Sequence, residues 1–176
     1  MKKIAIAILL STFVSPPAIA DLYTGIKLGG VDYKGSEVTN RSGTGYGLLY
    51  GNTVTKNFSV EGEFNSLGGY ASAADNVTGT AYSLSAIGFY PAKPGYSIFG
   101  KMGIFSNSLT VKAKPGSAQA GSYTINNRGL MVGFGAQYKV SKEIDVRAGA
   151  DIYPPWGGVP KTSALRMVYI CTVLKF

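Results

Sequence analysis

The last thirteen residues, 164–176, constrain the fold more than any other stretch of the chain. Read backwards from the carboxyl terminus, every second residue is apolar or a threonine: Phe176, Leu174, Thr172, Ile170 and Val168. Alternation with a period of two predicts a β-strand with one apolar face. Such a strand is either the edge of a soluble sheet or part of a barrel, and the rest of the chain has to distinguish these two possibilities.

Residues 1–20 have the three parts of a secretory signal peptide. Lys2 and Lys3 make the start basic, residues 4–14 are apolar, and Ala18-Ile19-Ala20 supplies the small residues of a cleavage site. The apolar part is shorter than the ~20 residues that a membrane-spanning helix needs. We therefore expect export, cleavage after Ala20, and a single domain over residues 21–176.

Seven further segments alternate in the same way as the last one. They cover residues 22–33, 44–51, 58–70, 79–90, 96–111, 127–140 and 144–153. Each is long enough for a strand, and each is bounded by polar residues, Gly or Pro, which favour turns. Together with the terminal segment, the pattern predicts an all-β fold with eight strands.

The expected connections differ in length from one end of the strands to the other. Long connections are expected at residues 34–43, 71–78, 112–126 and 154–161, and short turns at 52–57, 91–95 and 141–143. Long loops at one end and short turns at the other are typical of outer-membrane barrels. The prediction is an eight-stranded antiparallel up-and-down transmembrane β-barrel. A soluble lipocalin-like barrel shares the alternation and is the alternative, but the leader and the terminal aromatic favour the membrane.

Several short pieces of the chain carry a resemblance to a known family. They are Leu22-Tyr23-Thr24-Gly25-Ile26-Lys27-Leu28-Gly29, Val60-Glu61-Gly62-Glu63-Phe64, Ala86 through Pro91, Tyr138 through Ile144, and Leu174-Lys175-Phe176. In this order they resemble the eight-stranded barrel domain of the outer membrane protein A family. The resemblance implies residence in the outer membrane of a Gram-negative bacterium. We expect the barrel domain only, without the peptidoglycan-binding domain of full-length members.

The carboxyl-terminal strand also resembles the signal by which the barrel-assembly machinery recognises such proteins. Leu174 and Phe176 fit its last two positions, whereas Cys171 stands where the family usually has Gly and Tyr169 where it has a polar residue. The resemblance implies that the assembly machinery is a partner of this strand.

The faces opposite the apolar ones carry charged and polar side chains. If the apolar faces meet lipid, the lumen receives Lys27, Glu61, Glu63, Lys101, Gln137 and Arg147. Buried charges at one level have to pair, because an isolated buried charge is costly. We expect Glu61 to be the chief acidic partner of the three cations.

The family resemblance implies that this cluster forms a salt-bridge plug that can act as a gate. Two positions depart from the family: Ile87 stands where it has a second Lys, and Gln137 where it has a carboxylate. An eight-stranded barrel has only enough lumen for side chains. A static plug is therefore favoured over a gate.

The composition excludes several functions. The chain has no His and one Cys, so no catalytic activity, cofactor or metal site is expected. The net charge of +8 points to anionic lipopolysaccharide rather than nucleic acid, because an exported protein does not routinely meet nucleic acid. Lys112, Lys114 and Arg128 are candidate contacts to lipopolysaccharide phosphates or to a host surface. Two functions remain: a structural barrel whose loops serve surface interaction or adhesion, and a small pore or transport conduit.

Overall fold

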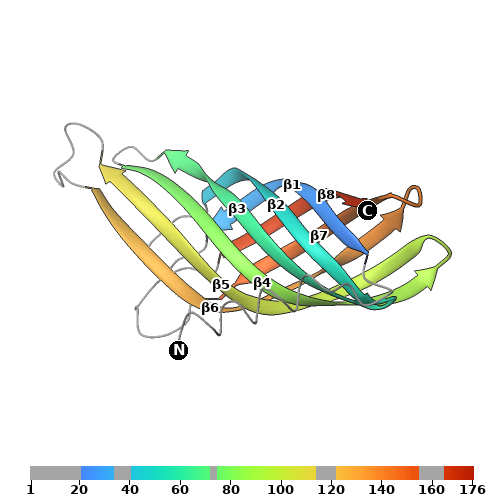
Figure 1. Ribbon diagram of the computed structural model, residues 1–176. Helices are drawn as coiled ribbons and strands as arrows, with labels where there is room; N and C mark the ends of the chain where they lie inside the picture. Colours follow the sequence, from blue (N-terminus) through green and yellow to red (C-terminus); the bar gives the residue numbers. More distant parts are fainter. Residues whose placement is uncertain (1–20, 34–40, 72–74, 114–121, 155–164) are drawn as a thin grey trace, which may run out of the picture.

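The computed structural model describes residues 21–33, 41–71, 75–113, 122–154 and 165–176. They form a closed barrel of eight antiparallel strands in sequence order (Figure 1). The strands are β1 Leu22–Tyr33, β2 Arg41–Thr55, β3 Phe58–Ala71, β4 Asp75–Lys93, β5 Tyr96–Ala113, β6 Ser122–Lys139, β7 Ile144–Tyr153 and β8 Leu165–Lys175. The predicted fold class is confirmed. The signal peptide proposed for residues 1–20 lies outside the described residues.

The terminal strand closes the barrel against the first. β8 pairs with β1 from Tyr23↔Lys175 to Tyr33↔Leu165. The backbone N–H of Phe176 extends this contact by donating to the Leu22 carbonyl oxygen at 2.9 Å. The apolar face predicted for this strand points outwards, and Phe176 is 77% exposed. No helix in the described part of the chain is long and apolar enough to cross a membrane.

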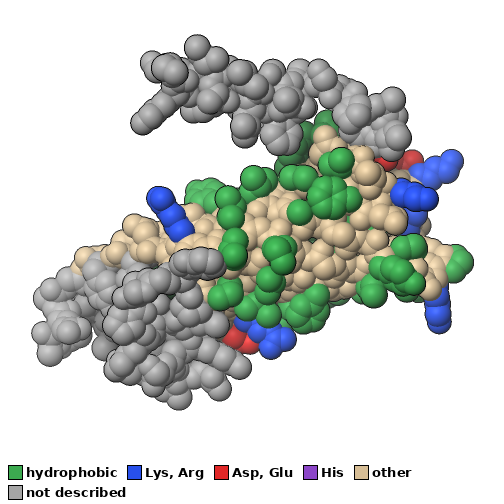
Figure 2. All heavy atoms as spheres, turned by 90° about the horizontal axis from the view of Figure 1, so that it is seen from below, with side chains coloured by type: hydrophobic (Ala, Val, Ile, Leu, Met, Phe, Trp, Pro, Cys, Tyr) green, Lys and Arg blue, Asp and Glu red, His purple; other side chains and the backbone are tan. Residues whose placement is uncertain are grey.

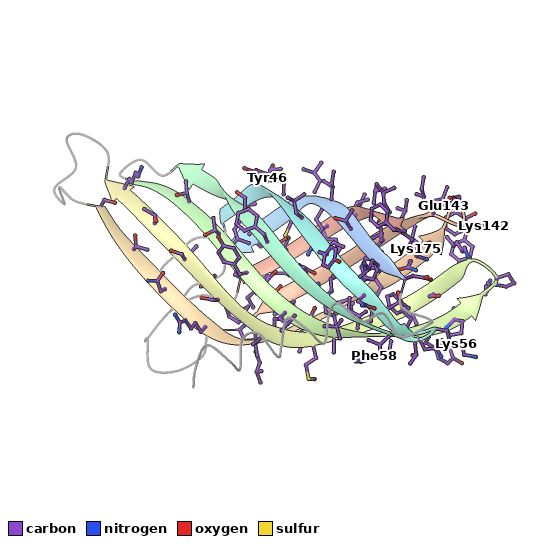
Figure 3. The ribbon with its side chains drawn as sticks, in the orientation of Figure 1. Tyr46, Lys56, Phe58, Lys142, Glu143 and Lys175 are labelled. Atoms are coloured by element: carbon purple, nitrogen blue, oxygen red, sulfur yellow. The ribbon has the colours of Figure 1, made fainter. Side chains whose placement is uncertain are left out.

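The outer wall is apolar over most of its height. Large aliphatic and aromatic side chains on every strand except β7 are exposed there. Figure 2 shows many of them on the face in view, with Lys and Arg side chains gathered at one end and a few more towards the other. In Figure 3, Lys56, Lys142 and Lys175 lie at that same end, which carries the short turns, and Tyr46 lies further along the wall. The charges thus border the apolar wall.

The turn between β4 and β5 is tighter than expected. The segment 91–95 was predicted as a turn, but β4 continues to Lys93, and the turn consists of Pro94 and Gly95. Gly95 has a φ of +81°, which Gly adopts without strain, and Pro94 supplies the fixed φ that precedes it. A register shift between Pro91 and Lys93 lets the strand continue past Pro91.

At the opposite end, β4, β5 and β6 extend beyond the predicted strands (Figure 1). The prediction of a loop over residues 112–126 is wrong at both ends, because β5 reaches Ala113 and β6 begins at Ser122. Their pairing continues without a break from Tyr96↔Tyr138 to Lys112↔Ser122. The residues of this region have the polar composition of a loop. They still form strands, because hydrogen bonds between neighbouring backbones do not require apolar side chains. The loop predicted over residues 71–78 is likewise shorter in the structure, because β4 begins at Asp75.

Candidate functional site

Charged side chains from four strands meet inside the barrel. Lys27 comes from β1, Glu61 and Glu63 from β3, Lys101 from β5, and Arg147 from β7. Each occupies an inward position of its strand, because alternate residues point to opposite faces. Their side chains are between 0% and 4% exposed. The fold therefore buries these charges together, away from bulk water.

Lys27 binds two carboxylates. Its Nζ lies 2.7 Å from Glu63 Oε2 and 2.6 Å from Asp151 Oδ2. The ammonium group also lies 3.9 Å from the centroid of the Tyr169 ring, a cation–π contact that strengthens when water is excluded. Glu61 is not its ion-pair partner, so the expectation that Glu61 is the chief acidic partner of the three cations is wrong for Lys27.

Lys101 lies between three carboxylates. It donates a hydrogen bond to Glu63 Oε1, and its Nζ is 3.4 Å from Glu61 Oε1 and 3.5 Å from Asp151 Oδ2. Glu63 thus joins both lysines, and Asn65 donates a further hydrogen bond to Glu63 Oε2 at 3.0 Å. Glu63, rather than Glu61, is the carboxylate shared by the two lysines.

Arg147 begins a second arm of the network, directed towards the turns. Its Nη1 lies 2.7 Å from Glu61 Oε2, and its Nε donates to Gln137 Oε1 at 2.6 Å. The amide of Gln137 then donates to Asp145 Oδ2 at 2.8 Å, and Asp145 pairs with Lys175 at 2.5 Å. Gln137, which has an amide where the family has a carboxylate, therefore links the buried network to the turn end.

Asp145 and Asp151 are site residues that the sequence-based prediction did not include. Both lie on the inward face of β7, two positions before and four after Arg147, and both are fully buried. The alternation of β7 was the available signal, because any inward carboxylate near three cations is a candidate partner. With Asp151 included, three cations face three carboxylates and the network at this level has no net charge.

Glycine makes room for this network. A Cβ added to Gly133 would lie 2.4 Å from Asp151 Oδ1 and 3.3 Å from Lys101 Cδ. On the other side of the lumen, a Cβ on Gly51 would lie 2.1 Å from Cζ of Tyr23. The ring of Tyr23 in turn lies 5.0 Å from the Arg147 guanidinium carbon. The small inner residues of the strands thus leave space for the large ones.

The predicted site residues outside the lumen set belong to the C-terminal strand and to the loop end, and two of them also lie beside this network. Tyr169 and Cys171 point inwards and line it, whereas Leu174 and Phe176 are exposed on the outer wall. Lys112 and Arg128 lie in strands β5 and β6 and are exposed, and Lys114 lies outside the described residues. Among the described residues, no group of His, Cys, Asp and Glu side chains is arranged to hold a metal ion.

Solved structures with similar folds are outer-membrane barrels. Neisserial surface protein A aligns with a TM-score of 0.74 at 14% identity, covering 89% of this chain and 99% of its own. The attachment invasion locus protein of Yersinia pestis, solved with the heparin analogue sucrose octasulfate, has a TM-score of 0.65 at 15% identity and coverages of 90% and 99%. The N-terminal β-barrel domain of Pseudomonas aeruginosa OprF has a TM-score of 0.60 at 17% identity and coverages of 88% and 97%.

At these identities, the likeness concerns the fold. A comparison with curated protein sequences finds no match. Residues 4–157 match the family described as outer membrane protein beta-barrel domain, a range that includes strands β1 to β7. The closed barrel, its apolar outer wall and this match agree with one another. The chain belongs to the outer membrane protein beta-barrel domain family.

Proposed function

We propose that the protein is a structural outer-membrane barrel whose lumen is sealed by its ion-pair network and whose loop end serves surface interaction. The observation that carries the proposal is the neutral group of Lys27, Lys101 and Arg147 with Glu61, Glu63 and Asp151, whose side chains are at most 4% exposed. A solute crossing the lumen would have to separate these pairs. Separating a buried ion pair is strongly unfavourable, because each charge is left without a partner or water.

The size of the barrel supports a sealed lumen. Eight strands enclose an interior that side chains alone can fill. Apolar residues including Leu67, Phe105, Met131 and Met167 form a buried cluster that is continuous with Tyr169 and Cys171 beside the ion pairs. A pore would require both the ion-pair network and this apolar cluster to move aside. The proposed role is therefore non-conducting.

Export and assembly are part of the proposal. We assign residues 1–20 to a signal peptide cleaved after Ala20, and the β8 residues Leu174 and Phe176 to recognition by the barrel-assembly machinery. Both side chains are exposed on the outer wall, where another protein can reach them before the barrel closes. Amino-terminal sequencing of the protein from isolated outer membranes tests the cleavage, and a mature start other than Asp21 contradicts it.

Surface interaction is assigned to the loop end. Lys112 and Arg128 are exposed there on β5 and β6, and cations at this height attract anionic saccharides and phosphates. We attribute an interaction of the loop end with a cell surface to these charges. We attribute the interaction of the barrel wall with lipid to its apolar side chains.

Conductance across planar lipid bilayers tests the sealed lumen against the pore. We expect the purified protein to insert and remain silent. Glu63→Ala leaves the network with one excess positive charge, and Lys101→Ala leaves it with one excess negative charge. Both variants loosen the network, so small conductances of opposite selectivity are expected, anion-preferring for Glu63→Ala and cation-preferring for Lys101→Ala. Stepwise conductance of the parent protein would establish the pore instead.

A further inference from the structure

Strands β4, β5 and β6 lie side by side (Figure 1), and the outer wall has a groove along them. Its volume is about 750 Å³, and its outward-facing lining residues are Tyr82, Leu84, Ile104, Ser106, Arg128 and Leu130. Two rows of register partners cross it, Leu84–Ile104–Leu130 and Tyr82–Ser106–Arg128. The first row is aliphatic. In the second, the small Ser106 separates Tyr82 from Arg128, so a hollow lies between a ring and a cation.

Arg128 marks the boundary of the apolar wall. On β6, the outward residues from Leu130 to Tyr138 are apolar, and Arg128 is the next outward position towards the loops. Ten residues of a strand tilted by ~40° rise about 25 Å, which is the height of the apolar band of such barrels. With Tyr138 near the turns, Arg128 therefore stands at the level of the outer-leaflet headgroups.

The charge of Arg128 is available to a ligand. No ion pair found among the described residues includes Arg128, and its register partner Ser106 is uncharged. Arg166 on β8 occupies the corresponding position next to Val168, but its register partner on β1 is Asp32. Each arginine is the first outward residue beyond the apolar part of its strand, and only Arg128 lines the groove.

Above Arg128, the same three strands present hydroxyl and amide groups. Thr80 and Ser108 are register partners, as are Ser108 and Asn126, and the next row joins Thr78, Thr110 and Thr124. The Oγ1 atoms of Thr110 and Thr124 lie 3.3 Å apart. From the turn end towards the loop end, the outer face of β4, β5 and β6 thus changes from an apolar groove to a cation and then to neutral hydrogen-bonding groups. We call this sequence of groups the track.

We propose that this track binds one phosphorylated glycolipid of the outer leaflet. An acyl chain occupies the groove, a phosphate binds the Arg128 guanidinium, and sugar hydroxyls contact the rows above. The order of chemical groups on the wall matches their order in such a lipid, and an arginine binds phosphate through charge-assisted hydrogen bonds. A phospholipid would use the groove and Arg128 but would leave the hydroxyl rows without a partner. The inference rests on the outer-membrane residence proposed above.

Binding of purified lipid A to the folded full-length mature protein in detergent micelles tests this inference. We expect the parent protein to retain lipid A, Arg128→Gln to weaken retention about tenfold through loss of a charged hydrogen bond, and Ser106→Leu to weaken it by filling the hollow. The matched controls are Arg166→Gln, which removes the arginine at the end of the apolar part of β8, and Thr172→Leu, which adds the same side chain to the wall outside the groove. Both controls are expected to bind like the parent.

Two further probes identify the part of the lipid that is recognised. Lipid A without its phosphates is expected to bind the parent and Arg128→Gln equally, and phosphatidylglycerol is expected to bind the parent more weakly than lipid A does. Equal retention of lipid A by the parent, Arg128→Gln and Ser106→Leu overturns the site. Equal Arg128-dependent binding of phosphatidylglycerol overturns the glycolipid assignment. Folding of each variant, read from heat-dependent gel migration, and its silence in planar bilayers separate a failure of this site from a failure of the sealed barrel.

Discussion

The inner and outer walls of the barrel are built from neighbouring residues of the same strands. On β1, Lys27 is 0% exposed inside the lumen, whereas Ile26 and Leu28 on either side of it are 66% and 61% exposed on the outer wall. One residue of displacement along a strand thus separates a fully paired charge from a lipid-facing aliphatic side chain. The inner wall holds charged side chains that the outer wall excludes over the height of its apolar band.

The difference has a physical cause. Outside, hydrocarbon offers no partner to a charge, so the wall lacks charges over the height of the apolar band. Inside, the side chains themselves supply the partners, and the ion pairs replace the missing water. The inner wall therefore depends on specific partners and fitted volumes, whereas the outer wall depends only on being apolar. Substitutions on the two walls should differ accordingly.

The largest effect is expected from removing one inner partner. Glu61→Ala leaves Arg147 with Gln137 as its remaining side-chain hydrogen-bond partner among the described residues, and breaking such a buried pair costs ~3–5 kcal/mol. Urea unfolding in detergent micelles measures this loss. Adding Arg147→Ala to the same chain restores neutrality, so the double variant should lose less than the sum of the two single losses. Additive losses would show that the two residues do not act as a pair.

A charge placed on the outer wall should cost somewhat less. Ile170 is exposed on β8, between Leu28 of β1 and Ala148 of β7, near the middle of the apolar band. Lysine at mid-height on the lipid side of a barrel destabilises it by ~2–4 kcal/mol, so Ile170→Lys should lower the free energy of unfolding in lipid vesicles by that amount. Ile170→Ala keeps the wall apolar and serves as the control. If both variants unfold alike, this face does not meet lipid.

The smallest effect compares one methyl group on each wall. A Cβ on Gly133 would contact Asp151 at 2.4 Å, whereas a Cβ on Gly100, on the outer wall of the neighbouring strand, meets nothing within 4 Å. Overpacking costs ~1–3 kcal/mol, so Gly133→Ala should lower the melting temperature while Gly100→Ala leaves it nearly unchanged. Equal melting temperatures would mean that the lumen accommodates an added methyl group as easily as the lipid-facing wall does.

Much of the fold follows from local alternation. The predicted bounds of β1 and β7 agree with the structure, and the inward and outward faces of β8 are as expected. The extensions of β4, β5 and β6 were missed, because their Ser, Thr and Asn residues have the composition of loops. Backbone pairing with a long neighbour holds such residues in strands, and pairing of this kind is not visible in one segment alone.

The sequence by itself determined which side chains face inwards, since a strand has a period of two and each segment shows its own apolar face. It therefore identified Lys27, Glu61, Glu63, Lys101 and Arg147 as residues of one interior. Only the tertiary structure decided their partners. Lys27 and Asp151 are 124 positions apart in the chain, and their contact depends on the tilt and register of strands that meet only when β8 closes against β1. A pairing that depends on closure of the whole barrel cannot be predicted from the sequence of any single strand.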